Sequence, residues 1–145
     1  KFGIEPKVAL LSHSNFGTYD DEGAHKMKHA AERLRRSNPD LEIDGEMHAI
    51  SAFNEQLRSS IFQNNRLTGR ANLLIMPNMD AASIALGLCR SISNAMMIGP
   101  YLNGLDKAAH ILIPSVSARG IFNMTALTVL DKISRGNIVQ QKLLA

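Results

Sequence analysis

The chain has 145 residues, which is enough for one domain of ordinary size. Its composition, 45% hydrophobic and 20% charged, is that of a globular protein and excludes a disordered chain. The formal net charge of +3 comes from scattered basic residues, and only 5% of the residues are aromatic. Because bases would find no stacking platform, we expect no nucleic-acid partner. The cluster of Arg33, Arg35 and Arg36 is expected to be solvated on a helix face.

Two further features bear on the compartment. No apolar run approaches the ~20 residues of a membrane-spanning helix, so we expect no membrane partner. Residues 1–6 lack the apolar core of a signal peptide, and the single Cys89 cannot form an internal disulfide, which favours a cytoplasmic protein. We expect Cys89 to be buried as a small hydrophobic residue on a helix. Because there is no initiator Met, we expect the chain to be a piece of a longer polypeptide.

The first half of the chain alternates between strand and helix patterns. A continuous apolar run at 7–12 predicts a strand covered on both faces. A second, shorter strand is predicted at 41–44 and a helix at 51–64. Apolar spacing predicts another helix at 20–37, with acidic residues at its start, arginines at its end and a buried side formed by Ala24, Met27, Ala31 and Leu34.

The second half continues the alternation. We predict a strand at 72–77, a helix at 81–94, strands at 96–100 and 110–113 joined by a turn at 103–104, and a helix from 117 to 130 or beyond, which breaks at Gly136 before a last short helix. Strands that alternate with helices indicate a mostly parallel sheet with helices on both faces. The predicted fold class is therefore α/β, a three-layer α/β/α sandwich.

Ligands of such sheets bind at the carboxyl ends of the strands, near helix N-termini. Three strand ends carry suitable polar residues, at 12–17, 78–80 and 114–120. Hydroxyls, amides and one fixed cation suit a phosphate or thioester ligand, and the same residue types also cap helices. The residue types support the two interpretations equally, and Ser117 is expected to be a cap. The candidate ligand-binding residues are Ser12, Ser14, Asn15, Ser115, Ser117, Arg119 and Asn123.

The sequence lacks the motifs of several other kinds of binding and catalytic site. No glycine-rich dinucleotide or phosphate loop and no Gly-x-Ser-x-Gly elbow is present. Ser12 and His13 are neighbours in an extended segment and point to opposite sides, so they are not expected to form a catalytic pair. His25 and His29 have the spacing of metal ligands, but a solvated helix face is the favoured interpretation. His110 begins an apolar run and is expected to be a structural histidine. We therefore expect neither a catalytic nor a metal site.

Several segments together resemble phosphotransacetylases. The resemblance is carried, in chain order, by KVALLSHS at 7–14, PDLEIDG at 39–45, GRANL at 69–73, IGP at 98–100 and TALT at 125–128. It covers nearly the whole chain, residues 1–145, and corresponds to the later half of that fold. The resemblance implies a sandwich of the isocitrate/isopropylmalate dehydrogenase-like type. It also implies a chemistry that moves acetyl between CoA and phosphate.

The chain departs from the family where the family's functional residues belong. Phosphotransacetylases usually have Ser-Arg-Gly in the last strand-to-helix loop and an acidic pair before the final helix. Aligning on residues 126–128 places Ser-Arg on Ile113 and Pro114, and the acidic pair on Arg119 and Gly120. A transferase without these groups loses most of its electrostatic assistance. We therefore expect this chain itself to be non-catalytic.

A related group is more similar. GEM at 45–47, NLLIMPNMDAA at 72–82, SAR at 117–119 and NMTAL at 123–127 are similar to the C-terminal region of large bacterial NADP-dependent malic enzymes. The resemblance implies an oligomerising regulatory domain that responds to acetyl-CoA, attached to a malic enzyme module that uses NADP and Mg or Mn to convert malate to pyruvate. A homodimer or larger homo-oligomer is expected. An active phosphate acetyltransferase and a purely structural assembly domain are the alternatives.

Overall fold

The computed structural model describes residues 3–93 and 96–143, and the chain divides into two compact units. The sheet unit covers residues 5–92, and the helix unit covers the described residues before Glu5 and after Ile92. The helix unit contains α5 (Ala118–Leu143). The sheet unit contains β1 (Lys7–Leu11), α1 (Glu22–Ser37), β2 (Glu42–Met47), α2 (Ala49–Phe53), α3 (Glu55–Ile61), β3 (Leu73–Ile75) and α4 (Met79–Ile92).

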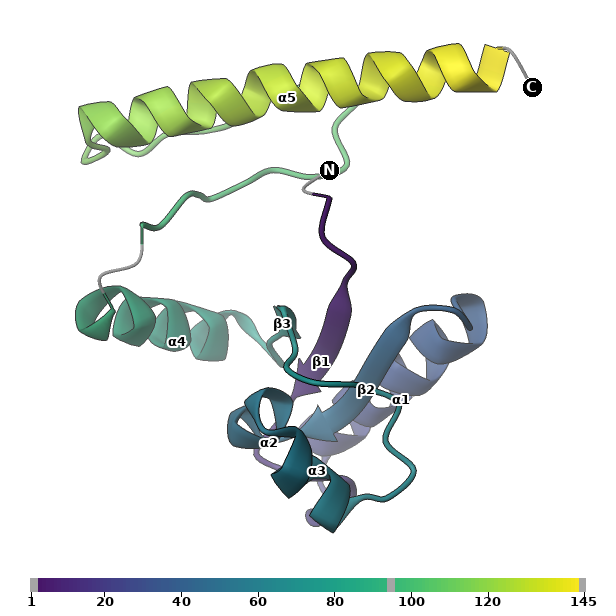
Figure 1. The fold of residues 1–145 in the computed structure, drawn as a ribbon. Helices are drawn as coiled ribbons and strands as arrows, with labels where there is room; N and C mark the ends of the chain where they lie inside the picture. Colours follow the sequence, from purple (N-terminus) through teal and green to yellow (C-terminus); the bar gives the residue numbers. More distant parts are fainter. Residues whose placement is uncertain (1–2, 94–95, 144–145) are drawn as a thin grey trace. The chain divides into compact units, whose positions relative to one another are not determined.

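The three strands form a parallel sheet in the order β2-β1-β3 (Figure 1). Val8 of the central strand pairs with Ile43 on one side and with Leu73 on the other. The backbone N–H of Lys7 also donates to Oδ1 of Asn72 at 2.8 Å, which fixes the start of β3 beside the start of β1. The predicted α/β class with a parallel sheet is thereby confirmed.

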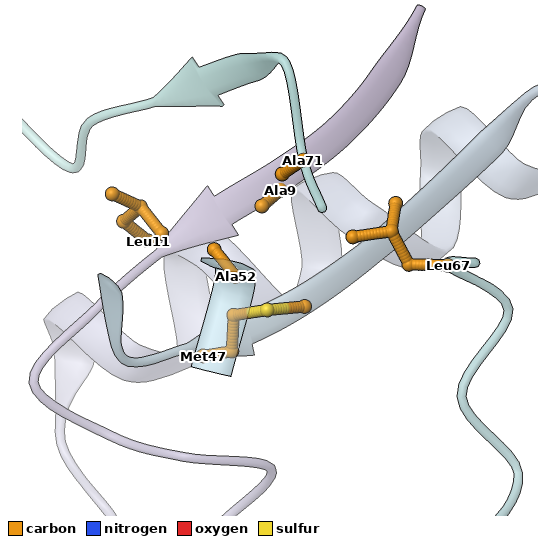
Figure 2. Close-up of a cluster of buried hydrophobic side chains, with 6 residues drawn as sticks. All are labelled: Ala9, Leu11, Met47, Ala52, Leu67 and Ala71. Atoms are coloured by element: carbon orange, nitrogen blue, oxygen red, sulfur yellow. The ribbon is translucent and has the colours of Figure 1, made fainter. Parts of the chain in front are cut away.

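Helices cover both faces of this sheet. Because successive strand residues point to opposite faces, β1 contributes to two hydrophobic clusters. Towards α1, Val8 and Leu10 pack with Met27, Ala31 and Ile43. On the opposite face, Figure 2 shows the second cluster, which consists of Ala9, Leu11, Met47, Ala52, Leu67 and Ala71. The order helix, sheet, helix follows from this division of β1.

The helix α1 forms as its sequence predicts. Asp21 accepts a hydrogen bond from the backbone N–H of Ala24 at 3.0 Å and so caps the first turn. Ala24, Met27 and Ala31 are buried, whereas Leu34 is 37% exposed and lies at the margin of the predicted buried side. Arg35 is not merely solvated, because its guanidinium hydrogen-bonds to the buried carboxylate of Asp44.

The predicted helix at 51–64 is instead two short helices, α2 and α3, and β2 extends to Met47. The reason is Asn54. Its backbone N–H closes α2 on the carbonyl of Ile50 at 3.1 Å, and its side chain caps α3 by accepting from the N–H of Leu57 at 3.0 Å. Helical spacing alone cannot show this break, since an asparagine is also tolerated inside a helix.

Arg58 on α3 is fully buried and fastens the segment between α3 and β3 to the sheet unit. Its guanidinium donates to Oδ1 of Asn65 at 3.1 Å and to the backbone carbonyls of Ser51 at 2.8 Å, Leu67 at 2.7 Å and Gly69 at 3.0 Å. These bonds bring Leu67 into the cluster shown in Figure 2. A long connection without regular structure is thereby held in one conformation.

The helix α4 has no buried residue. Its large apolar side chains, among them Met79 at 78% and Ile92 at 84%, are exposed. Cys89 is exposed too, so the prediction of a buried cysteine is wrong. The predicted helix at 81–94 is confirmed from its start to Ile92, and Asn94 lies outside the described residues. Among the helices that the structure describes, none has the length and apolar character to cross a membrane.

The helix unit departs from prediction in two places. Residues 96–100 and 110–113 are not strands, because no described strand of that unit lies beside them to pair with. Ile111 and Ile113 are exposed. The bend at 103–104 is present, with Gly104 at a φ of 84°. The helix α5 continues without interruption through Gly136 to Leu143, so the predicted break is wrong.

Candidate functional site

The β1–α1 loop (residues 12–20) follows the carboxyl end of β1 and carries three of the candidate residues. Ser14 is fully buried, and its hydroxyl donates to Oε1 of Glu46 at 2.9 Å. The same carboxylate oxygen accepts the backbone N–H of Gly17 at 2.5 Å. The Ser14 hydroxyl oxygen in turn accepts the backbone N–H of Tyr19 at 3.2 Å. Glu46, on the neighbouring strand β2, therefore organises this loop.

Ser12 and Asn15 also bond within the chain. Oγ of Ser12 accepts the backbone N–H of Ser14 at 3.0 Å. Asn15 is 7% exposed, and its side-chain oxygen accepts the backbone N–H of His48 at 3.1 Å. These side chains set the shape of the loop, while the prediction that Ser12, Ser14 and Asn15 contact a ligand stays a prediction. Glu46 is not predictable from the sequence, because a single acidic residue in a strand has no distinctive signal.

The side chain of His13 contacts Asp21. Its Nε2 lies 2.7 Å from a carboxylate oxygen of Asp21, and Oγ of Ser12 accepts from a backbone N–H. The prediction that Ser12 and His13 are not a catalytic pair stays a prediction. The pKa of Asp21 is lowered from its ordinary value, chiefly by the hydrogen bond from the N–H of Ala24 and also by the proximity of His13. The loop and the start of α1 are thus joined through Asp21.

The other candidate residues belong to the helix unit. Ser117 accepts the backbone N–H of Gly120 at 3.1 Å, so its predicted role as the cap of α5 is confirmed. Nδ2 of Asn123 lies 3.0 Å from the sulfur of Met96, while Ser115 and Arg119 are exposed. The structure brings Ser12, Ser14 and Asn15 together in one unit, and it places Ser115, Ser117, Arg119 and Asn123 in the other.

Three further histidines are not among the candidate residues. His25 and His29 are exposed on α1, with ring centroids 5.9 Å apart, and His25 is paired with Asp20. The favoured interpretation of a solvated helix face is confirmed. Nδ1 of His110 accepts the N–H of Leu102 at 3.2 Å, and its ring lies 4.4 Å from that of Tyr101. Within the part of the chain that the structure describes, no group of three or more potential ligands is arranged to hold a metal ion.

A parallel sheet with helices on both faces and a polar loop at the carboxyl end of its central strand define an α/β protein. The chain belongs to the phosphate acetyl/butaryl transferase family, whose model matches residues 1–129. Among solved structures, a phosphotransacetylase from Streptococcus pyogenes is similar, with a TM-score of 0.84 and 29% identity over 90% of this chain and 40% of that chain. The EutD phosphotransacetylase from Staphylococcus aureus has a TM-score of 0.81 and 25% identity over 88% of this chain and 40% of its own.

Sequence relatives include two kinds of enzyme. The chain is 50% identical to an NADP-dependent malic enzyme from Salmonella typhimurium over 90% of its length, and 50% identical to an NAD-dependent malic enzyme from Rhizobium meliloti. It is 34% identical to a phosphate acetyltransferase from Paracoccus denitrificans. The chain spans 17% of the length of those malic enzymes and 40% of that of the acetyltransferase. The predicted resemblance to the phosphotransacetylase-like region of malic enzymes is confirmed.

Proposed function

We propose that this chain is a regulatory phosphotransacetylase-like domain that binds acetyl-CoA and controls a malic enzyme module of the same polypeptide. The observation that carries the proposal is the ranking of relatives. Identity is 48–50% to several malic enzymes, 35% to another and 34% to a phosphate acetyltransferase. In this proposal the attached module oxidises malate to pyruvate in the cytoplasm, with NADP and Mg or Mn bound outside the present chain.

The loop of the helix unit that contains residues 113 and 114 departs from the family pattern. This departure favours a domain that binds a ligand without transferring an acetyl group. The resemblance places Ile113 and Pro114 where phosphotransacetylases usually carry Ser-Arg, and neither side chain can stabilise charge on a phosphate. The exposed guanidinium of Arg119 keeps one anion-binding group in this unit. Binding without turnover suffices for regulation, because allosteric control needs a coupling of only about 1–3 kcal/mol between two sites.

The exposed apolar surface of α4 supports the oligomerising part of the proposal. A helix that is apolar nearly all round is normally buried, and α4 has no buried residue. Its charged residues, Asp80 and Arg90, lie in its first and last turns. The chain spans 40% of the length of the acetyltransferase it matches, so the occupant of this surface is either the rest of the polypeptide or a second copy. A second copy packed antiparallel would place each Asp80 near the partner's Arg90.

Calorimetric titration with acetyl-CoA tests the sensor, on this chain and on a complete malic enzyme that contains it. We expect saturable binding in both and a change of malic enzyme activity in the second. Failure of both to bind acetyl-CoA at millimolar concentration would overturn the proposal. Formation of acetyl-CoA from acetyl phosphate, abolished by Arg119→Ala, would instead establish an active phosphate acetyltransferase.

A further inference from the structure

A cavity of about 250 Å³ lies beside the β1–α1 loop in the sheet unit. Its walls come from that loop, from the first turns of α1 and from the end of β2, which is the edge where ligands of parallel sheets bind. The volume is below the usual range of drug-sized sites and fits a small metabolite. The lining residues include Gly17, Tyr19, Asp20, His25, Lys28 and Glu46.

The charges of the cavity are divided between its two sides. Asp20 and His25 are paired with each other. Lys28 is exposed on α1, and no ion pair joins it to any residue that the structure describes. Glu46 is 2% exposed, and its carboxylate is held in place by the Ser14 hydroxyl and the Gly17 N–H. One wall therefore offers an ammonium group and another offers a fixed acceptor.

We propose that this cavity binds a small hydroxycarboxylate. The carboxylate of the ligand would pair with the ammonium of Lys28, and its hydroxyl would donate to the carboxylate of Glu46. The two groups select together, because a ligand hydroxyl adds a hydrogen bond to the Glu46 carboxylate that an unsubstituted carboxylic acid cannot make. The inference does not depend on acetyl-CoA binding, since its two contacts, Lys28 and Glu46, are not among the residues proposed for that ligand.

Calorimetry with lactate and with propionate, which differs only by lacking the hydroxyl, tests the proposal. We expect lactate to bind with a millimolar Kd and propionate about tenfold more weakly, the effect of one hydrogen bond to a charged group. Lys28→Gln should weaken lactate binding about tenfold by the same reasoning. The matched control is Arg33→Gln, which removes one positive charge from the same helix and should leave the affinity unchanged.

Three results would overturn the inference: no lactate binding at millimolar concentration, equal binding of propionate, or an equal loss with Arg33→Gln. Lys28→Arg, which keeps the charge, should retain most of the affinity. Circular dichroism of each variant shows whether α1 is intact. Titration with acetyl-CoA is a separate measurement, so the failure of one proposal leaves the other open to its own test.

Discussion

Substitution of Arg58 by methionine should strongly destabilise the sheet unit. The guanidinium makes four hydrogen bonds, three of them to the backbone carbonyls of Ser51, Leu67 and Gly69. Methionine fills much of the same volume and satisfies none of these acceptors. A buried polar group left without its partner costs about 1–3 kcal/mol. Removing a buried charge recovers part of that cost, because the arginine itself was desolvated on folding.

The balance predicts that Arg58→Met lowers the free energy of unfolding by about 3 kcal/mol, a large part of the 5–15 kcal/mol typical of a domain. Equilibrium unfolding in urea, followed by circular dichroism, measures the change. Arg70→Met is the matched control, because Arg70 is exposed and its guanidinium lies 5.6 Å from the ring centroid of Phe53. A loss for Arg58→Met no larger than that for Arg70→Met would refute the reasoning.

Three further predictions concern the same unit. Ser51→Ala should leave the free energy of unfolding in urea unchanged or raise it by up to about 1 kcal/mol, because the buried hydroxyl has no hydrogen-bond partner among the described atoms; a clear loss would contradict this. Gly45→Ala should lower the midpoint of thermal unfolding markedly, since the residue has a φ of 139° and a Cβ there would lie 2.5 Å from the carbonyl oxygen of Leu10. An unchanged midpoint would contradict this prediction and show that the strand can shift to make room. The pKa of Glu42 is lowered, chiefly by the hydrogen bond from the N–H of Thr68, so its stabilising effect is present at neutral pH and is lost as the pH falls through the acid range. Glu42→Gln should therefore flatten this part of the stability–pH profile, and an unaltered profile would exclude the carboxylate as its source.

The elements predicted correctly are those whose signals are local. β1 is a short apolar run bounded by polar residues, and α1 has a cap, an apolar side and basic residues in its last turn. In both elements the residues that are apolar in the sequence pattern are mostly the ones buried in the structure. The same holds for the parallel sheet, because alternation of strands and helices leaves few other arrangements.

The errors arise where the environment is decided by distant residues. Residues 110–113 have the composition of a strand, yet a strand also needs a neighbour to pair with, and no described strand of the helix unit supplies one. Cys89 lies on a helix whose apolar side chains are all exposed or only partly covered. Arg58 and Glu46 are charged and buried, which is exceptional for their residue types, so only the three-dimensional structure reveals their roles.

For the candidate site, sequence reasoning found the loop but not its organisation. The polar atoms of Ser14 and Asn15 make these residues candidates, yet both are buried among partners within the chain. The residue that holds the loop, Glu46, lies 32 positions beyond Ser14. A hydrogen bond across such a separation leaves no trace in local spacing.

The central position of β1 bears on how the chain acquires its structure during synthesis. Of the three strands of this sheet, β1 is made first, yet Lys7 meets Asn72 only after 65 further residues have been made. Its apolar residues stay uncovered until β2 and β3 have been made. The uncovered period is prolonged because pairing between distant parallel strands forms slowly. The nascent chain is therefore most vulnerable to aggregation in this interval. A chaperone that shields exposed apolar segments would act on β1 at this stage.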